Sequence, residues 1–375
     1  MAIFPEKGRT EKEILKEINK AKELDFDFSS GKILGSMCTE SVDVGKKVHK
    51  MFLESNLGNP GLYEGTKDIE KKVHEAVGSL IGSEFEEVLS VGGATEGNII
   101  ALWRARNVSG KRKVLIPESA HFSFQKACNL LDMEPIYIPL DDDYRVDVSI
   151  IKEEIDEKTA AVVGIAGTTE LGQIDPIDEI AELCDDTFFH VDAAFGGFVL
   201  PFLKELEYEQ TCYQFDFKNI DTYVLDPHKM GMSTIPFGLM FSKEGSPLSI
   251  ESPYLTGKDQ KTIRGTRSSA PIPAFWATLN YLGKEGYLKI VDKCMENTYY
   301  LIEKMEELGF EPIIVPIMNI ASFHHEDPKS TVKAMKKEGF NISRTVNPPG
   351  LRFVVMPHVS KSSIDEMIRT LGDYV

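Results

Sequence analysis

The sequence predicts an α/β fold, built on a mainly parallel sheet with helices on both faces and followed by a small C-terminal α+β domain. Two observations predict it. Between about residues 87 and 242, short runs rich in β-branched residues alternate with amphipathic segments, a rhythm typical of parallel strands joined by helices. Beyond residue 282, a long helical pattern leads into short strands with two further helical patterns, around 328–338 and 361–372.

The elements follow in chain order. Helices are expected over 10–24 and about 67–81, with irregular Gly-rich stretches between them. The strands of the large sheet are expected at EVLSV, KVLIP, PIYIPL, AAVVGIAG, FFHVDAA, TYVLD and GLMFS, and those of the small domain at EPIIVP, NIASFH and LRFVVMP. These patterns divide the chain into an N-terminal helical segment over 1–60, a large ligand-binding domain over 61–281 and a small domain over 282–375.

Composition excludes several classes of partner. The chain has 375 residues, and its net charge of -17 repels nucleic acid and anionic membranes. No apolar run approaches the roughly 20 residues that span a bilayer, and the N-terminus lacks the apolar core of a signal peptide. The five cysteines are odd in number and have no CxxC spacing, so we expect a cytoplasmic protein without disulfides or structural zinc.

A Gly-rich turn stands at VGGATEGN, residues 91–98. Gly92 and Gly93 let the backbone approach a ligand, and the helix that begins near Thr95 offers free N–H groups and a hydroxyl to a phosphate. Thr95 as a plain helix N-cap is the alternative. A Walker loop is excluded, because no Gly-Lys-Ser/Thr follows.

Two further loops follow strands and carry side chains suited to a ligand. His121 comes after KVLIP, where an imidazole could stack on an aromatic ring, and a capping or surface histidine is the alternative. Thr168 and Thr169 follow AAVVGIA, where they could donate to a ligand or form a turn with their hydroxyls.

Asp192 ends an otherwise apolar strand in FFHVDAAFGG. A buried carboxylate needs a partner, and a protonated ring nitrogen is one. Ala193 and Ala194 leave room for a flat group beside the strand. His190 and Asp192 share a face and could bind a metal, but the sequence offers no obvious further ligands, so no metal is expected.

Lys229 follows the strand TYVLD within DPHKMG. A half-buried lysine loses its proton more readily, and its amine can form a Schiff base with an aldehyde. A surface charge is the alternative for any single lysine. Taken together, a phosphate turn, a stacking histidine, an aspartate and a lysine at successive strand ends are suited to pyridoxal 5'-phosphate (PLP).

The motifs HVDAAFGGFVLPF and DPHKMG resemble those of the group II PLP-dependent amino-acid decarboxylases, a branch of the fold-type I PLP enzymes. GSMCTE, NPGLYEGT, PYLT, GTRS, CMENT and LRFVVMPH are similar to the archaeal L-tyrosine/L-aspartate decarboxylase subfamily. This resemblance runs through nearly the whole chain. It implies the fold-type I PLP-dependent transferase fold, with PLP in the large domain.

The resemblance also implies a role for individual residues. Lys229 would form the Schiff base with the cofactor and Asp192 would hold its ring nitrogen, with His121 stacked on one ring face and Ala194 packed on the other. The remaining cofactor contacts would come from Ala94, Thr95, Thr169 and His228.

On the substrate side, Arg352 would bind the α-carboxylate, and Tyr254 would lie in a mobile catalytic loop that often serves the neighbouring subunit. The GTRS segment at 265–268 would reach a partner's phosphate site in the same way, so a homodimer with active sites at the interface is expected. The sequence departs from the family pattern in two places. SVDVG follows GSMCTE, and this departure affects side-chain specificity. Ala94 stands where relatives often carry a hydroxyl residue, so its backbone N–H must serve the phosphate.

The expected reaction is loss of the α-carboxylate as carbon dioxide, with Tyr254 or Lys229 returning a proton to Cα. L-Tyrosine would give tyramine for methanofuran biosynthesis, and L-aspartate would give β-alanine for coenzyme A. Another fold-type I PLP reaction, such as transamination or lysis, and a non-catalytic PLP-binding protein remain as alternatives. The sequence alone leaves the substrate open.

Overall fold

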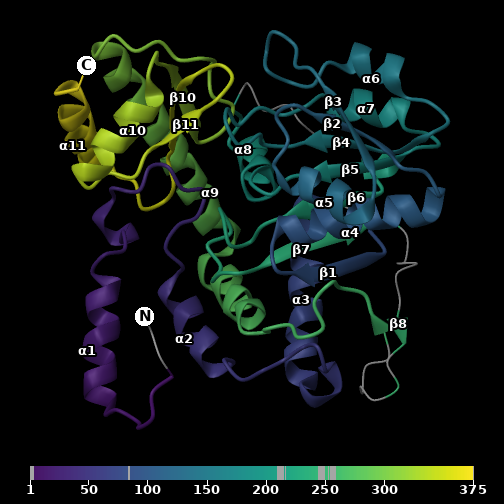
Figure 1. Cartoon of the computed structure of the whole chain (residues 1–375), viewed down its shortest axis with the longest axis horizontal. Helices are drawn as coiled ribbons and strands as arrows, with labels where there is room; N and C mark the ends of the chain where they lie inside the picture. The colour runs from purple at the N-terminus through teal and green to yellow at the C-terminus, as the bar shows by residue number, and fades with distance from the viewer. Residues whose placement is uncertain are drawn as a thin grey trace.

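The computed structural model describes residues 4–82, 85–208, 215, 217–243, 250–251, 253 and 259–374. Its centre is a seven-stranded sheet in the order β1-β7-β6-β5-β4-β2-β3 (Figure 1). β3, β2, β4, β5 and β6 run parallel, and β7 is antiparallel to both β6 and β1. The strands are β1 Glu87–Val91, β2 Lys113–Pro117, β3 Glu134–Ile138, β4 Thr159–Ile165, β5 Phe188–Asp192, β6 Thr222–Leu225 and β7 Gly238–Ser242.

Helices cover both faces of this sheet because neighbouring side chains of each buried strand point to opposite sides. In β4, Val162 packs into the core under α6, α7 and α9, whereas Ala161 and Val163 pack under α4 and α5. The predicted sheet with helices on both faces is therefore confirmed. The helices around it are α3 Glu64–Ile81, α4 Ala94–Ser109, α5 Ser123–Leu131, α6 Val148–Glu154, α7 Ile177–Leu183, α8 Leu200–Glu205 and α9 Pro271–Glu307.

The C-terminal part forms a separate layer with a core of its own. Its antiparallel sheet has the order β10-β12-β11 and is packed with α10 and α11 (Figure 1). α9 passes through the predicted boundary at 281/282 and has non-helical backbone at Gly283. The domain boundaries themselves stay a prediction. The elements are β10 Ile320–His324, α10 Pro328–Lys337, β11 Ser343–Thr345, β12 Gly350–Val354 and α11 Lys361–Gly372.

The expected strand at EPIIVP is wrong. The segment forms a single bridge, from Pro312 to Phe323, with hydrogen bonds from Ile313 N–H to the Ser322 carbonyl and from His324 N–H to the Glu311 carbonyl. Pro312 and Pro316 have no N–H to donate, so a regular ladder cannot continue through them. The short strand β11 takes the edge of the small sheet instead.

The N-terminal segment joins the small domain. Leu34 N–H donates to the Asn341 carbonyl, and Val354 N–H donates to the Leu34 carbonyl, so this segment borders β12. α2 (Asp43–Met51) follows, while α1 (Glu11–Lys22) stands clear of the sheet and has no buried residue (Figure 1). A two-stranded ribbon, β8 (Ile250–Glu251) with β9 (Asp259–Gln260), completes the described elements. Within the described residues, none of the helices is long and apolar enough to cross a membrane.

Candidate active site

A cavity of about 360 Å³ opens where the parallel strands end. Ligands of open α/β sheets bind at this edge, outside the carboxyl ends of the strands. The cavity volume falls within the range of small-molecule sites. Its walls come from the loops after β1, β2, β4, β5 and β6, with Met37 from the N-terminal segment.

Eight of the predicted site residues line this cavity: Ala94, Thr95, His121, Thr169, Asp192, Ala194, His228 and Lys229. They come from five separate segments of the chain, and the parallel strand order brings those segments to one edge. Arg352 does not line the cavity, and Tyr254 lies outside the described residues.

The Gly-rich turn leads directly into α4. Gly93 occupies the N-cap position with φ 126°, a backbone conformation that favours glycine. The alternative of Thr95 as the N-cap is therefore wrong, since Thr95 lies inside the first turn. Ala94 N–H donates to Asp226 Oδ1 over 2.7 Å, so it does not point freely at a ligand as expected. Thr95 remains the polar side chain that this turn presents to the cavity.

Asp192 ends β5, is buried and faces the cavity. Its Oδ1 accepts a hydrogen bond from Ala194 N–H at 2.9 Å, and its Oδ2 accepts one from Asn98 Nδ2 at 2.8 Å. These two bonds fix the orientation of the carboxylate. A buried carboxylate directed at a cavity is suited to a cationic N–H of a ligand.

His190 cannot serve the metal site that its spacing allowed. Its Nδ1 lies 2.8 Å from Thr222 Oγ1 and its Nε2 lies 2.9 Å from Asn98 Oδ1, so both ring nitrogens are engaged. Burial lowers the pKa of His190 to about 4, although the Asp192 carboxylate opposes this shift. The imidazole is therefore neutral at physiological pH.

Lys229 follows β6 and lies across a short turn from Asp226. Its Nζ is 3.5 Å from Asp226 Oδ2, and His228 Nδ1 is 3.7 Å from Asp226 Oδ1. Burial raises the pKa of Asp226, while the charges of Lys229 and His228 oppose this effect. His228 Nδ1 also lies 2.5 Å from the Phe237 carbonyl, which fixes its ring.

His121 borders the cavity beside a second loop residue, Ser119. The Nδ1 of His121 accepts a hydrogen bond from Ser123 N–H at 3.2 Å. Burial lowers the pKa of His121, which favours a neutral, flat ring at the cavity wall. The buried hydroxyl of Ser119 has no hydrogen-bond partner among the described residues, so a polar ligand group would satisfy it.

Arg352 belongs to β12 of the small domain and is 7% exposed. Its Nη1 donates to Ser343 Oγ at 3.0 Å, whereas its buried Nε has no partner in the described chain. Burial lowers the pKa of Arg352 to about 10, with the Glu170 carboxylate opposing. Glu170 is adjacent in the chain to Thr169, which lines the cavity.

The 265–268 segment makes bonds within its own chain. Arg267 pairs with Glu70 at 3.1 Å and donates to the Leu57 carbonyl at 3.0 Å. The preceding Arg264 pairs with Glu96 at 2.9 Å, and Glu96 accepts from Gly92 N–H at 2.7 Å. Arg264 is therefore the arginine beside the phosphate-type turn in this chain.

Among the residues at or behind the cavity that sequence analysis missed are Met37, Asn98, Ser119 and Asp226. Asp226 had a detectable signal, because it directly follows the buried strand β6. Asn98 stood inside the Gly-rich motif VGGATEGN, and Ser119 stood in the loop after KVLIP, beside His121. Only the packing of α4 against β5 shows that Asn98 reaches Asp192.

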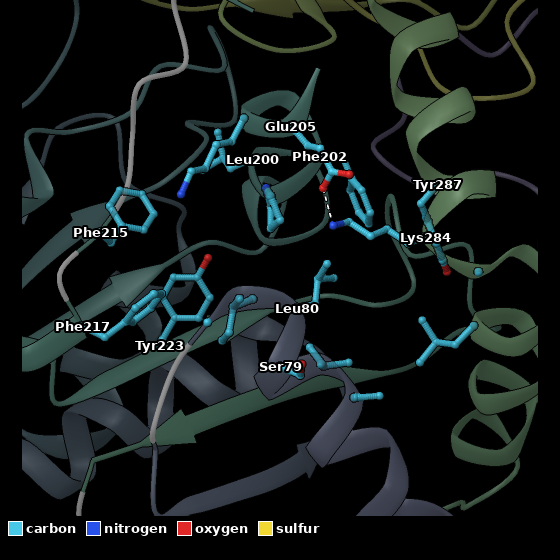
Figure 2. A pocket seen from close by; sticks show the side chains of 18 residues that line it. Ser79, Leu80, Leu200, Phe202, Glu205, Phe215, Phe217, Tyr223, Lys284 and Tyr287 are labelled. Carbon is cyan, nitrogen blue, oxygen red and sulfur yellow. Dashed lines mark ion pairs between the residues drawn. The ribbon is translucent and has the colours of Figure 1, made fainter. Parts of the chain in front are cut away.

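A second cavity, of about 740 Å³, lies between α3, α8, β6 and α9 (Figure 2). Its walls are mainly apolar or aromatic, and Glu205 and Lys284 form an ion pair beside it. No residue of the first cavity lines it. The Tyr287 hydroxyl donates from its wall to the Gly231 carbonyl at 2.8 Å, so this region supports the turn that carries Lys229.

The fold and the first cavity define a class of protein. A lysine amine, a buried carboxylate and a Gly-rich turn at a helix N-terminus meet at the edge of a mainly parallel sheet, which is the donor set that a PLP enzyme needs. The unsatisfied Ser119 hydroxyl fits such an anionic, hydrogen-bonding cofactor.

Comparison with known proteins identifies the family. Residues 98–324 match the pyridoxal-dependent decarboxylase conserved domain, and the chain belongs to this family. It is therefore a PLP-dependent carboxy-lyase, as the motifs predicted. His121, Asp192 and Lys229 lie within the matched region.

Named relatives extend the likeness over nearly the full length. An L-tyrosine/L-aspartate decarboxylase of Methanocaldococcus jannaschii is 41% identical, covering 99% of both chains. A probable enzyme of the same name from Methanothermobacter thermautotrophicus is 42% identical, covering 92% of this chain and 97% of the relative. A probable L-aspartate decarboxylase of Archaeoglobus fulgidus is 41% identical, covering 95% and 97%.

Solved structures agree on the fold. A sphingosine-1-phosphate lyase of Burkholderia pseudomallei superposes with a TM-score of 0.90 at 21% identity, covering 100% of this chain and 92% of the other. A glutamate decarboxylase of Lactobacillus brevis gives 0.86 at 20% identity, covering 100% and 94%. The predicted fold-type I architecture is confirmed.

Proposed function

We propose that this decarboxylase acts on L-tyrosine, with L-aspartate as the second candidate substrate, and that it works as a cytoplasmic homodimer. The observation that carries the proposal is the shared cavity of Lys229, Asp192 and His121. The buried Arg352 interacts with Glu170, which follows the cavity residue Thr169 in the chain. The names of the relatives supply the two candidate substrates.

The residues of the cavity divide among the parts of the cofactor. Lys229 would bind its aldehyde, Asp192 would accept a hydrogen bond from its ring nitrogen, and His121 would cover one face of the ring. Ala194, being small, would allow close approach on the other face. The phosphate would be held by Thr95 and His228, with the unsatisfied Ser119 hydroxyl as a further donor.

PLP, when bound, supplies an electron sink for the pair left behind as carbon dioxide departs. The chain controls which bond breaks, because orientation of the substrate sets which bond is aligned for cleavage. Arg352 would grip the α-carboxylate, since a guanidinium with a free N–H forms strong charge-assisted bonds to carboxylates. Thr169 would line the substrate side of the ring.

A proton must return to Cα after carbon dioxide leaves. Lys229 Nζ or the Tyr254 hydroxyl would deliver it. Asp226, 3.5 Å from Lys229 Nζ, would keep this amine near the reacting carbon while it is not bonded to the cofactor. Tyr254 would act in its own subunit or in the partner's.

The cavity walls favour L-tyrosine over L-aspartate. Among the described lining residues, Lys229 is the sole lysine or arginine, and Met37, Phe122 and Ile235 are apolar. A second carboxylate, that of an aspartate side chain, would prefer an additional cation, whereas an aromatic ring fits apolar walls. Met37 lies in GSMCTE, directly before the SVDVG stretch that the sequence associated with side-chain specificity.

A homodimer would explain the exposed apolar side chains of the N-terminal helix. Ile14, Leu15 and Ile18 of α1 are 44%, 50% and 58% exposed. An amphipathic helix without a packed face is stabilised by a partner surface. A second copy of this chain would supply one and would bring the 265–268 segment near the neighbouring active site.

Product identification tests the proposed function. Purified protein with PLP would be incubated anaerobically with L-tyrosine, L-aspartate or L-glutamate, and products separated by mass spectrometry. Tyramine would support the proposal and link the enzyme to methanofuran. β-Alanine as the main product would reverse the substrate order and link it to coenzyme A. A keto acid without carbon dioxide release would indicate transamination and contradict the proposal.

A further inference from the structure

A chain of buried hydrogen bonds runs behind Asp192 on the side away from the cavity. Asp192 Oδ2 is bonded to Asn98, Asn98 to His190, and His190 to Thr222, with successive distances of 2.8, 2.9 and 2.8 Å. Asn98, His190 and Thr222 are each 0% exposed. None of the three lines the cavity.

The direction of these bonds follows from Asn98. Its Nδ2 faces two oxygens, Asp192 Oδ2 and Ser123 Oγ, the latter at 2.9 Å. Turning the amide over would set its oxygen against the carboxylate, which leaves a buried charge facing a lone pair. The amide nitrogen therefore points at Asp192, and Oδ1 must accept from His190.

That orientation determines the tautomer of His190. Because Asn98 Oδ1 can only accept, His190 Nε2 must carry the proton. A neutral imidazole then has Nδ1 unprotonated, and Thr222 Oγ1 must donate to it. Each member thus donates toward Asp192: Thr222 O–H to His190, His190 N–H to Asn98, and Asn98 N–H to the carboxylate.

We propose that Asn98, His190 and Thr222 form a one-way donor relay that holds Asp192 as an oriented anion for the ring nitrogen of PLP. They are positioning residues, acting on the cofactor only through Asp192. Aligned hydrogen-bond dipoles strengthen one another in a buried site, so each link adds to the stabilisation of the carboxylate charge. In metal sites, the histidine ligands are likewise oriented by hydrogen bonds to residues that do not touch the metal. The proposal rests on the proposed role of Asp192.

Asn98→Asp is the sharpest test, because it keeps the shape of the side chain and replaces the donor to Asp192 with an acceptor. The dissociation constant of PLP, measured by absorbance titration of the cofactor-free protein, is expected to rise roughly ten- to a hundred-fold. Asn297→Asp is the matched control. Asn297 is 2% exposed, and its Nδ2 donates to the Val359 carbonyl at 2.9 Å, away from the cavity, so its variant loses stability without the same loss of affinity.

Thr222 provides a second pair of variants. Thr222→Ser keeps the hydroxyl that donates to His190 Nδ1 and should bind PLP as the parent does. Thr222→Val removes it, leaving His190 Nδ1 without its donor, and should weaken binding several-fold. A purely structural role for Thr222 would lower the melting temperature of the valine variant without weakening PLP binding.

The tautomer is measured directly by ¹⁵N NMR of histidine-labelled, cofactor-free protein, with His190→Gln used to assign the signal. Protonated Nε2 with unprotonated Nδ1 is expected, and this readout is independent of PLP chemistry and of substrate. The opposite tautomer would overturn the relay, as would equal PLP affinity in Asn98→Asp and Asn297→Asp. Neither result depends on which amino acid the enzyme decarboxylates, so failure of the relay is distinguishable from failure of the proposed substrate.

Discussion

Lys229 Nζ lies 3.5 Å from Asp226 Oδ2, while the other oxygen of the same carboxylate accepts a hydrogen bond from Ala94 N–H at 2.7 Å. One buried aspartate therefore ties the lysine turn after β6 to the Gly-rich turn before α4. These turns are over 130 residues apart in the chain. The link sets the position of the proposed Schiff-base lysine against the proposed phosphate turn.

Replacing Lys229 tests its assignment as the lysine that binds the cofactor. Lys229→Ala should abolish the absorbance of the lysine-bound cofactor and lower turnover by roughly a thousand-fold or more, because both the covalent link and a proton donor are lost. Absorbance spectra and carbon dioxide release measure the two effects. Lys289→Ala, at an exposed ion pair with Glu285, is the control and should behave as the parent. Retained activity in Lys229→Ala would contradict the assignment.

If Arg352 binds the α-carboxylate of the substrate, its replacement should impair substrate binding but not cofactor binding. Arg352→Gln should raise KM for the amino acid by about a hundred-fold, since a charge-assisted bond is lost, and should leave the absorbance of the bound cofactor unchanged. Steady-state kinetics beside a PLP titration separate these effects. Arg344→Gln, on the neighbouring strand β11, is the matched control. An unchanged KM would exclude Arg352 from substrate binding.

Gly238 marks a close approach between β7 and the Gly-rich turn. A Cβ at Gly238 would lie 2.7 Å from Gly93 Cα and 2.9 Å from Asp226 Oδ1. Gly238→Ala should therefore displace this turn and reduce PLP affinity by at least about ten-fold. Gly65→Ala, with nothing within 4 Å of its Cβ, should instead raise stability by about 0.5–1 kcal/mol as a helix substitution. Equal PLP affinity in both variants would show that the turn tolerates the contact.

Asp175 predicts how stability depends on pH. Burial raises its pKa from 3.8 to about 7, although Val146 N–H and Ile165 N–H oppose this effect. The folded state therefore keeps a proton that the unfolded state releases above about pH 4, so stability falls as pH rises from about 4 to 7. The contribution is at most on the order of 4 kcal/mol.

Urea unfolding at pH 5 and pH 7.5 measures this dependence. Asp175→Asn cannot ionise, so its unfolding free energy should decrease less between the two pH values than that of the parent protein. Asp68→Asn, at an exposed position of α3, should keep the parental difference. The same difference in all three proteins would mean that Asp175 ionises normally.

Tyr254 lies outside the described residues, so its role is predicted from the sequence alone. If its hydroxyl protonates Cα, Tyr254→Phe should lower amine yield by about a hundred-fold and divert part of the product to an aldehyde. Chromatography of the reaction mixture measures both. Full amine yield without aldehyde would remove Tyr254 from the mechanism and leave Lys229 as the donor.

Much of the fold was predictable because its signals are local. The strands around Asp192 and Lys229 are short, β-branched and buried, and amphipathic segments lie between them. The two errors in predicting strands also have local causes. EPIIVP has the composition of a strand but carries two prolines, and β11 is only three residues long, too short for a periodic signal.

Partner assignments were less predictable than residue positions. Ala94 was correctly placed at the cavity, yet its N–H donates to Asp226, a bond between segments far apart in the chain. His190 was considered as a metal ligand, whereas it contacts Asn98 and Thr222. The spacing of residues in the sequence indicates which side chains share a face. It does not indicate their hydrogen-bond partners, because those belong to another helix or strand.

The sequence by itself determined the chemistry of this protein: a histidine, an aspartate and a lysine, each at the end of a different strand, in the order that suits PLP. Those features follow from composition and periodicity, which act over a few residues. The tertiary structure decided which groups face one another, including Asp226 beside Lys229 and Asn98 behind Asp192. Such pairings depend on strand order and helix packing, which bring together residues that no local pattern connects.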